Sequence, residues 1–403
     1  MIARLTILFF ILFSNSLCSY SQTSSENIQF EFYGNSVSYP FNQSAFIDFT
    51  DIQSETSINA FLQQVNNNDN FRLIIDTLLA YKEKNKLDDW LYYQLIRKAV
   101  QQISPKNSNY QRYTLYKYFF LIQSGYDALL AICNNQILFY VHSNEDIFNI
   151  PYRIINEKQY VCLNYHDYGA NIDFIKNKFT LVNLNIAKGK NSFSYKVISL
   201  PEFKPTDYQV KNIQFTYYEQ NYHFKIKINP EIKTIFANYP VVDYESYFNI
   251  PLSKETYQSL IPLLKENIKK MNQKSGVEYL MHFTRYAFLF ETDSKIYGSE
   301  KRFSPEQTLL SDYSDCEDRA ALFFYLVKEI YNLPMLVLAY PNHVTIAVQF
   351  KNSYGKPILY NGNEYTICEP TPQNNDLRIG RILPHLKNIA YEIAYVYAPP
   401  KIN

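Results

Sequence analysis

The residues best suited to chemistry in this sequence are a cysteine, a histidine and a glutamate in its C-terminal third. Cys316 stands where an acidic run turns into a strongly apolar one that predicts a helix. The start of a helix carries unpaired backbone N–H groups and the positive end of the helix dipole, and both favour the thiolate form of a thiol. His343 begins an alternating run typical of a strand, and Glu369 ends another. Cys, His and carboxylate in this order are the components of a thiol hydrolase or acyltransferase.

The spacing of these residues allows adjacent elements to bring them together. Twenty-seven residues separate Cys316 from His343 and 26 separate His343 from Glu369, and each interval is about one helix or one hairpin. His343 shares its strand face with the small residues Thr345 and Ala347, which leaves room beside the imidazole for a helix end or a substrate. We therefore predict that Cys316 attacks, that His343 moves the proton and that Glu369 orients the ring of His343.

Three acidic residues flank the thiol. Asp315, Glu317 and Asp318 are expected to cap the predicted helix and to favour its positive end. Their negative charge also works against the thiolate, because a nearby carboxylate raises the pKa of a thiol. Hard oxygen ligands suit calcium, so the same three acids are also a candidate calcium site.

A hydrolase of this kind needs a donor for the oxyanion that forms on the substrate. The backbone N–H of Cys316 is one expected donor, and Gln307 or Tyr313 is the candidate side-chain donor. A competing cluster, Cys162, His166 and Asp167, lies along one predicted strand. There the thiol and the imidazole are too far apart for direct contact, so we interpret this cluster as a strand that ends in a turn.

The composition describes a globular protein with no nucleic-acid-binding character. Of its 403 residues, 47% are hydrophobic and 19% are charged, with a net charge of +1. Lys and Arg form no cluster, so no nucleic acid is expected as a partner. Five Cys without any C-x-x-C spacing exclude a disulfide scaffold and a structural zinc site. Cys133 and Cys162 could still pair in an oxidising compartment.

The N-terminal residues 1–21 are typical of a signal peptide. Arg4 precedes an apolar run, and small residues at Ser19 and Ser21 fit a cleavage site near Ser21. The apolar run is shorter than the roughly 20 residues that span a bilayer, and no later segment is long and apolar enough. We expect an exported chain, periplasmic, envelope-bound or secreted, with no transmembrane segment in its mature form.

The periodicity of the remaining sequence predicts an α+β fold in three parts. Residues 22–134 begin with one or two short strands and then read as mainly helical, with the last helix running to Cys133. Residues 135–250 alternate with period two and predict a β-rich domain, a sandwich or a barrel. Residues 251–403 return to helix, continue through the apolar helix after Cys316 and end in short antiparallel strands. The sequence shows no internal repeat.

The C-terminal part, about 253–385, resembles the transglutaminase-like proteins of the papain-like cysteine-hydrolase clan. The resemblance rests on a Cys at the start of a buried helix, a His on the second strand after it, and an acid before Pro-Thr. That acid is usually Asp in the family, whereas this chain has Glu369-Pro370-Thr371. The region is also similar to uncharacterised secreted proteins of Bacteroidetes in which Asp-Cys-Glu-Asp-Arg and Tyr-Pro-x-His-Val recur. The resemblance implies a transglutaminase-like domain with a Cys nucleophile, a His base and an acidic partner, and some bacterial members bind calcium through flanking acids.

Three functions fit these observations. The first is a secreted or periplasmic thiol hydrolase, a cysteine peptidase or amidase, which acts on a peptide or protein and requires no cofactor. The second is a non-catalytic binding protein of the cell envelope, because about two thirds of the chain lies outside the family-like region. The third is a transamidase that cross-links proteins through a Lys amine. A solvent-open groove at Cys316 would favour a catalytic function.

Overall fold

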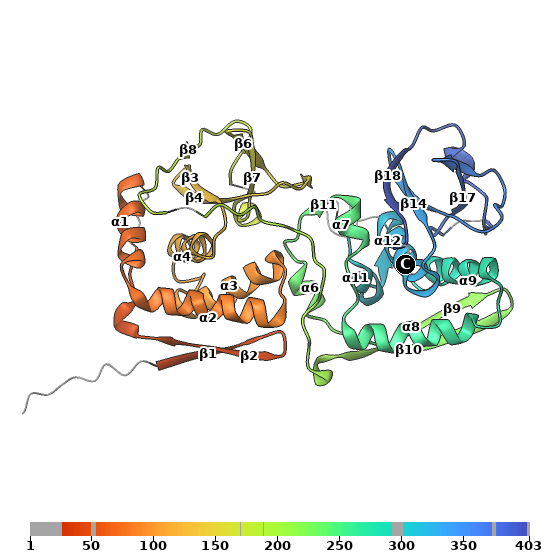
Figure 1. Ribbon diagram of the computed structural model, residues 1–403, viewed down its shortest axis with the longest axis horizontal. Coiled ribbons are helices and arrows are strands. Elements are labelled where there is room, and N and C mark those ends of the chain that lie inside the picture. Colours follow the sequence, from red (N-terminus) through yellow and green to blue (C-terminus); the bar gives the residue numbers. More distant parts are fainter. Residues whose placement is uncertain are drawn as a thin grey trace, which may run out of the picture.

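The computed structural model describes residues 26–49, 54–169, 171–187, 189–291, 301–372 and 376–400. The predicted signal peptide, 1–21, lies outside the described residues. The described part is α+β, with helices and curled antiparallel sheets arranged in two lobes that lie side by side (Figure 1). Within the described ranges, no helix is long and apolar enough to cross a bilayer.

The N-terminal lobe stacks a hairpin, a layer of helices and an antiparallel sheet. Its main elements are β1 (Glu26–Phe32), β2 (Asn35–Phe41), α1 (Glu55–Asn66), α2 (Asp69–Asn85), α3 (Asp89–Ile103), α4 (Tyr110–Gln123), β3 (Ala128–Cys133), β4 (Gln136–His142), β5 (Ile147–Phe148), β6 (Tyr152–Ile155), β7 (Lys158–Cys162), α5 (Tyr165–Tyr168) and β8 (Thr180–Leu181). The hairpin β1–β2 packs on α2 and α3, and α4 lies between these helices and the sheet. The strand order of the sheet is β6-β7-β4-β3-β8.

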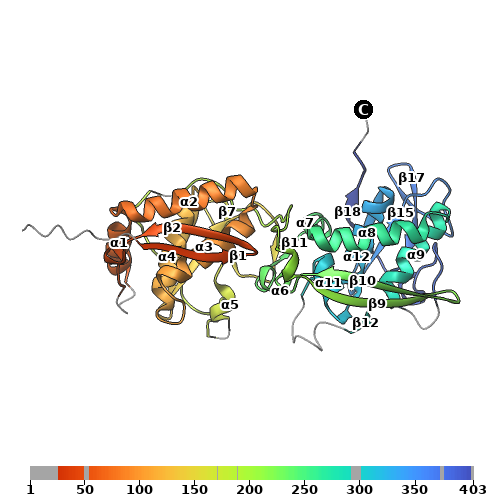
Figure 2. The ribbon, with the colours of Figure 1, turned by 90° about the horizontal axis from the view of Figure 1, so that it is seen from below.

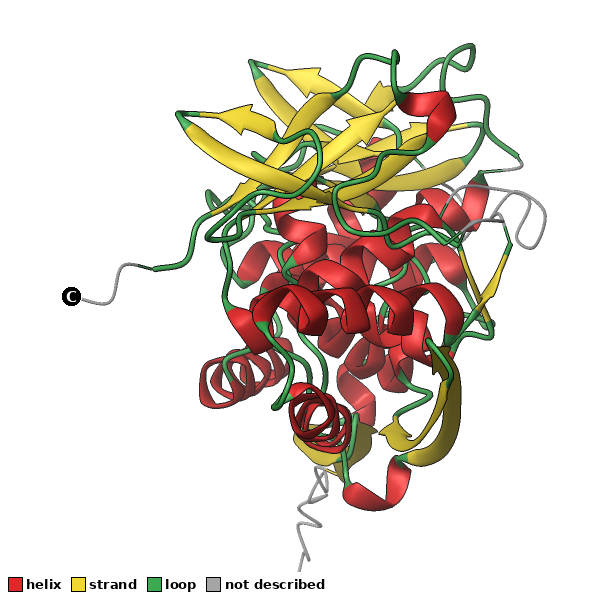
Figure 3. Cartoon of the chain, turned by 90° about the vertical axis from the view of Figure 1, so that its right-hand side faces the viewer, coloured by secondary structure: helices red, strands yellow, loops and turns green. Residues whose placement is uncertain are grey.

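The C-terminal lobe repeats this layering, as the view in Figure 3 shows. Its elements are β9 (Gln209–Tyr217), β10 (Gln220–Ile228), α8 (Lys254–Ile268), α9 (Gln273–Tyr286), β12 (Leu289–Phe290), α11 (Pro305–Leu310), β13 (Tyr313–Ser314), α12 (Cys316–Tyr331), β14 (Met335–Tyr340), β15 (His343–Val348), β16 (Ile358–Tyr360), β17 (Asn363–Cys368) and β18 (Glu392–Tyr397). The hairpin β9–β10 packs on α8 and α9, and α12 packs on α9 and β15. The strand order is β16-β17-β15-β14-β18.

A joining segment, which follows β10 and precedes α8 of the C-terminal lobe, lies against both lobes, whereas the chain itself passes from one lobe to the other between β8 and β9. The joining segment contains α6 (Ile232–Ile235), β11 (Val241–Val242) and α7 (Tyr244–Phe248). Strand β11 pairs with β5 of the N-terminal lobe, and the indole N–H of Trp90 donates to the carbonyl of Ile235 at 2.9 Å. Helix α7 contacts α12 of the C-terminal lobe. The joining segment therefore packs on both lobes.

The two lobes are copies of one architecture, down to the pairing of individual residues. Cys133 pairs with Gln136 across the turn from β3 to β4, as Tyr340 pairs with His343 across the turn from β14 to β15. Farther along the sheets, β7 pairs with β4 in the same register in which β17 pairs with β15. The two hairpins also lie on the same side of the molecule, the lower side in Figure 1, which is seen from below in Figure 2. The structure is therefore repeated although the sequence shows no internal repeat. The reason is that a core constrains the spacing and size of its side chains more than their identity.

The strands of residues 135–250 are divided between the two lobes, which differs from the predicted β-rich middle domain. Strands β4, β6, β7 and β8 complete a sheet that begins with β3, whereas β9 and β10 belong to the C-terminal lobe. The expected boundary at 134/135 falls inside the turn between β3 and β4. Alternating hydrophobic residues show that one face of a strand is buried, but they do not show which sheet the strand joins. The last predicted helix is also shorter, because Gly125 at φ 96° follows the end of α4 and 128–133 form a strand.

Helix α12 is the central element of the C-terminal lobe. Its middle is buried, and Phe324 packs edge-on against Phe248 of α7. The side chain of Asp315 caps its N-terminus, and Asn332 at φ 49° ends it in the left-handed conformation. A helix that is apolar nearly all round must be buried, as the sequence predicts. The caps fix its first turn, and Cys316 is the first residue of that turn.

Candidate active site

Cys316 is placed differently from the other described cysteines. Cys316 is partly exposed, whereas Cys133, Cys162 and Cys368 are buried. All four are free thiols. The pairing considered for Cys133 and Cys162 is therefore not formed. The thiol of Cys316 accepts a hydrogen bond from the backbone N–H of Val344, the residue after His343. Cys316 thus lies beside the start of β15.

His343 and Glu369 form a hydrogen-bonded pair at the same end of β15. The ring Nε2 of His343 lies 2.8 Å from Oε2 of Glu369, and the carboxylate is only 2% exposed. The other carboxylate oxygen accepts the backbone N–H of Thr371 at 2.9 Å. These two contacts hold the carboxylate and fix the orientation of the imidazole. Because Nε2 is engaged by Glu369, Nδ1 is the ring nitrogen left for the thiol.

Strand pairing explains why residues far apart in the sequence meet here. Cys368 of β17 pairs with Ile346 of β15, so Glu369 follows directly at the edge where β15 begins. Helix α12 packs across β15 and brings its first residue to the same edge. The structure therefore brings three predicted site residues together beside the start of β15: Cys316 from α12, His343 from β15 itself and Glu369 from the end of β17.

The acids around the thiol are engaged by the chain itself. Oδ1 of Asp315 accepts the backbone N–H groups of Glu317 and Asp318 at 3.0 and 3.2 Å. Asp318 accepts the N–H of Phe303 at 2.8 Å, and Glu317 pairs with Nε of Arg302 at 2.9 Å. Across the described ranges, no group of three or more His, Cys, Asp or Glu residues is arranged to hold a metal ion. Asp315 therefore caps the helix start, while Asp318 and Glu317 hold residues 302 and 303 against it. The calcium site considered from the sequence stays a prediction.

The environment of Cys316 favours the protonated thiol. Burial of the thiol is the main cause that raises its pKa, and the negative charges of Asp315, Glu317 and Glu369 raise it further. The hydrogen bond from the N–H of Val344 acts in the opposite direction. The position at a helix start is thus not enough to produce a thiolate at neutral pH. A base must take the proton during attack, and His343 is the neighbouring residue able to do so.

We expect the variant Asp315→Asn to react with alkylating reagents at lower pH than the native protein. Asn caps a helix as well as Asp does, so the fold is kept while one negative charge beside the thiol is removed. The pKa of Cys316 falls, and the curve of alkylation rate against pH shifts to lower pH. Asp315→Ala also loses the cap, which costs about 0.5–2 kcal/mol of stability. Mass spectrometry of iodoacetamide labelling at Cys316 measures the shift, and an unshifted curve would contradict this electrostatic role.

The two candidate oxyanion donors, Gln307 and Tyr313, differ in their surroundings. The side-chain oxygen of Gln307 accepts the backbone N–H of Ser304 at 3.0 Å, so it completes the capping box of α11. Tyr313 is 42% exposed on β13, three residues before Cys316. The structure gives Gln307 a structural task and leaves Tyr313 as the candidate nearer the thiol in the chain.

Arg319 and Arg285 support the site and were not predicted from the sequence. Arg319 is fully buried, and its guanidinium donates to the carbonyls of Thr284, Arg285 and Phe288 at 2.6–3.0 Å. It ties the first turn of α12 to the end of α9. Arg285 donates from Nε to the backbone carbonyl of Glu369 at 2.7 Å. An Arg within an otherwise apolar helix is the signal that could have revealed the first, because a buried guanidinium needs acceptors.

The N-terminal lobe provides an internal comparison for the site. Tyr110 begins α4 as Cys316 begins α12, and Gln136 begins β4 as His343 begins β15. By the shared register, Asn164 takes the place of Glu369, and its side chain bonds the backbone N–H of Phe139 at 2.9 Å and the carbonyl of Ile137 at 3.0 Å.

The intervals agree as well, since 26 and 28 residues separate Tyr110, Gln136 and Asn164, close to the 27 and 26 of the C-terminal lobe. At the start of α4, Gln111 donates from Nε2 to Oε1 of Gln136 at 2.7 Å. None of these side chains is a thiol, an imidazole or a carboxylate. The same fold thus forms without Cys, His and Glu at these three positions, so folding alone does not demand them.

The competing cluster of the N-terminal lobe has a structural arrangement. Cys162 is buried at the end of β7. Asp167 accepts from Nζ of Lys106 and from the hydroxyl of Tyr110, each at 2.5 Å. Burial lowers the pKa of His166 to about 4. Asp167 therefore anchors the start of α4.

The chain matches none of the family models, curated proteins or solved structures with which it was compared. The geometry described above therefore carries the functional interpretation, and the resemblance to transglutaminase-like proteins stays a prediction from the sequence.

Proposed function

We propose that this protein is a transglutaminase-like thiol hydrolase that cleaves a peptide or amide bond. The supporting observation is the bond of 2.8 Å between His343 and the buried Glu369, beside the thiol of Cys316. The equivalent positions of the N-terminal lobe carry Tyr, Gln and Asn, so the Cys, His and Glu are specific to one copy of the fold. The proposal includes export through residues 1–21 and a peptide or protein as substrate.

The reaction follows from the order of the three groups. Nδ1 of His343 takes the thiol proton while the sulfur of Cys316 attacks the carbonyl carbon of the substrate. The backbone N–H of Cys316 donates to the oxyanion of the tetrahedral intermediate. The imidazolium then gives its proton to the leaving amine, the C–N bond breaks and a thioester remains. Water, activated by His343, hydrolyses the thioester and restores the thiol, while Glu369 stabilises the imidazolium in each half of the reaction.

Selective alkylation tests the proposed site. Iodoacetamide should label Cys316 faster than Cys133, Cys162 or Cys368, because those three thiols are buried. His343→Ala should slow labelling of Cys316, since the base that accepts the proton is removed. Gln136→Ala changes the equivalent position of the N-terminal lobe and should leave the labelling of Cys316 unchanged. Equal, slow labelling of all the thiols, unaffected by His343→Ala, would remove the basis of the proposal.

A non-catalytic binding protein is the second candidate. The raised pKa of Cys316 favours it, because a thiol that stays protonated is a weak nucleophile. The presence of a whole lobe without the three catalytic residue types is in keeping with a binding role for at least part of the chain. A protein that binds peptides, labels slowly at Cys316 and cleaves none of them would support this second function.

A further inference from the structure

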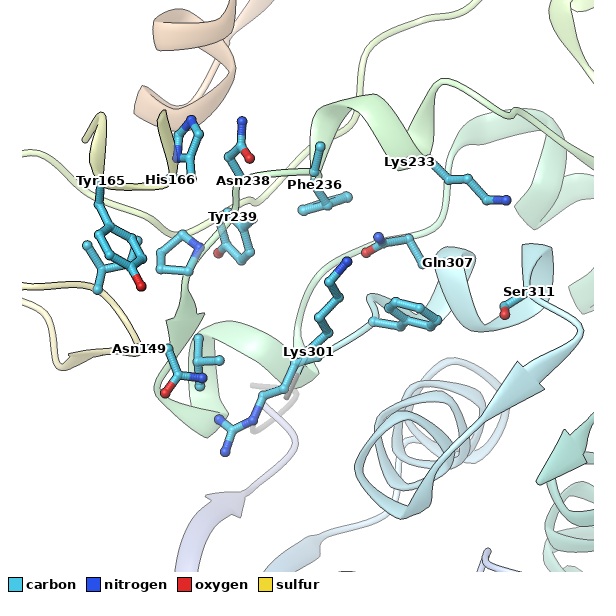
Figure 4. A pocket seen from close by; sticks show the side chains of 16 residues that line it. Asn149, Tyr165, His166, Lys233, Phe236, Asn238, Tyr239, Lys301, Gln307 and Ser311 are labelled. Atoms are coloured by element: carbon cyan, nitrogen blue, oxygen red, sulfur yellow. The ribbon is translucent and has the colours of Figure 1, made fainter. Parts of the chain in front are cut away.

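A cavity of about 740 Å³ lies where the two lobes meet (Figure 4). Tyr165 and His166 line it from the N-terminal lobe, and residues 233–241 of the joining segment form another wall. From the C-terminal lobe come residues between 301 and 311. The volume is within the range of about 300–1,000 Å³ that is common for ligand-binding pockets.

The walls of this cavity are made from segments in which the two copies differ. The N-terminal lobe connects α3 to α4 through residues 104–109, whereas residues 287–315 connect α9 to α12. This longer connection supplies Lys301, Arg302 and Gln307 to the cavity. On the other side, Tyr165 and His166 follow Asn164, the residue in the place of Glu369. The cavity is thus lined by the longer α9–α12 connection of the C-terminal lobe and by the residues that follow Asn164 in the N-terminal lobe.

The charged side chains among the described lining residues are all basic. Lys233, Lys301 and Arg302 line the cavity, and among the described lining residues there is no Asp or Glu. Arg302 pairs with Glu317, and Lys233 and Lys301 are the other positively charged residues of the described lining. His166 adds no charge at neutral pH, because burial lowers its pKa to about 4. Figure 4 shows the Lys301 side chain extending toward Gln307, inside the cavity.

The cavity adjoins the start of the helix that carries the thiol. Arg302 bonds Glu317, the residue next to Cys316, at 2.9 Å. Phe303, also part of the lining, donates its backbone N–H to Asp318 at 2.8 Å. One side chain therefore separates the cavity wall from the first turn of α12. A substrate that reaches Cys316 can extend one end toward the space between the lobes.

We propose that the cavity between the lobes binds a carboxylate-bearing segment of the substrate, so that the enzyme prefers acidic peptides. The inference rests on the proposed function, since it assigns one end of the same substrate. Lysine ammonium groups attract carboxylates, and basic side chains in a cavity raise the local concentration of such a ligand. Aromatic walls at Tyr165, Phe236 and Tyr239 can pack on the aliphatic part of acidic side chains. The N-terminal copy then acts as a substrate-binding lobe.

Peptide binding to the Cys316→Ala variant tests the proposal without any turnover. The probes are an acetylated and amidated hexapeptide that alternates Ala with Glu, and its counterpart with Gln in place of Glu. Isothermal titration calorimetry should show that the Glu peptide binds about tenfold or more tightly than the Gln peptide. Lys301→Glu and Lys233→Glu should each weaken the Glu peptide several-fold, and added salt should weaken it as well. Lys265→Glu, a charge reversal on the exposed face of α8, is the matched control and should have no effect.

Equal affinities for the two peptides, or an affinity unchanged in Lys301→Glu and Lys233→Glu together, would overturn the proposal. Both lysines are exposed, so the charge reversals should leave thermal unfolding unchanged. Loss of acidic-peptide binding says nothing against the triad, which the labelling of Cys316 tests separately. Conversely, a protein that binds the Glu peptide but labels slowly at Cys316 would keep this inference and count against hydrolysis.

Discussion

Replacing His343 with Ala should lower kcat/KM for peptide hydrolysis by roughly 10²–10⁴-fold while the chain keeps its fold. The thiol of Cys316 has a raised pKa, so little thiolate exists at neutral pH without a base to take the proton. His343 lies at the start of β15 and is held by Glu369. Removing the imidazole also leaves the leaving amine without a proton donor, which affects both steps of acylation. His343 is therefore the side chain at this end of β15 to which the proposal assigns both proton transfers.

The effect is best measured on a mixture of peptides whose cleavage products are followed by mass spectrometry. Cys316→Ala should abolish the cleavage, and Glu369→Gln should reduce it less than His343→Ala, because the amide can still hold the ring by a hydrogen bond. Gln136→Ala and Asn164→Ala alter the equivalent positions of the N-terminal lobe and are controls for cleavage. Cleavage that survives in His343→Ala would contradict the proposed mechanism. Cleavage that depends on Gln136 would show that the wrong lobe has been assigned the chemistry.

The sequence predicted the local elements of the C-terminal lobe because each has a strong local signal. Asn361 and Gly362 both have positive φ values, as expected for the two-residue hairpin turn that their sequence indicates. The helix after Cys316 begins at an acidic cap and is apolar nearly all round, and the structure buries it. These features depend on neighbours in the sequence, so a single chain contains enough information to find them.

The duplication could not be predicted, because it is a property of pairing and not of residue identity. Gln136 and His343 occupy the same register, and Asn164 and Glu369 do as well, yet the residue types differ at both places. Sheet order is decided by which strands meet across the core, and alternation alone does not record it. For this reason the sequence predicts a separate domain for the strands after 135, although β4, β6, β7 and β8 complete the sheet of the first lobe and β9 and β10 belong to the second.

The candidate site was predicted in its residues but not in its energetics. The order Cys316, His343, Glu369 follows from the sequence, and so does the effect of the flanking acids on the pKa of the thiol. The largest cause of that raised pKa is burial, which depends on the packing of the whole lobe. Likewise, only the structure shows that Gln307 caps α11 and that Arg319 is fully buried among carbonyl groups.

Arg319→Leu should destabilise the C-terminal lobe by about 3 kcal/mol or more, although the substitution makes α12 more apolar. The guanidinium donates to the carbonyls of Thr284 and Arg285 in the last turn of α9 and of Phe288 just before β12, and at 3.4 Å to that of Ser314. Leu leaves these buried acceptors without a donor, and each such loss costs about 1–3 kcal/mol. For a lobe of this size the thermal midpoint should fall by at least about 6 °C. Circular dichroism against temperature measures the change.

The first turn of α12 should also become less well fixed, so that iodoacetamide labelling of Cys316 changes together with stability. Arg319→Lys retains the charge but not the planar fork of donors, and it should have an intermediate effect. Tyr113→Leu is a matched control, because Tyr113 is the fourth residue of α4 as Arg319 is of α12. Its hydroxyl donates to the carbonyl of Arg97 over a long 3.4 Å, and the loss of this bond should cost about 1 kcal/mol. If Arg319→Leu has the same thermal midpoint as the native protein, the guanidinium is not what joins α12 to α9. The apolar contacts of the helix alone must then position the thiol.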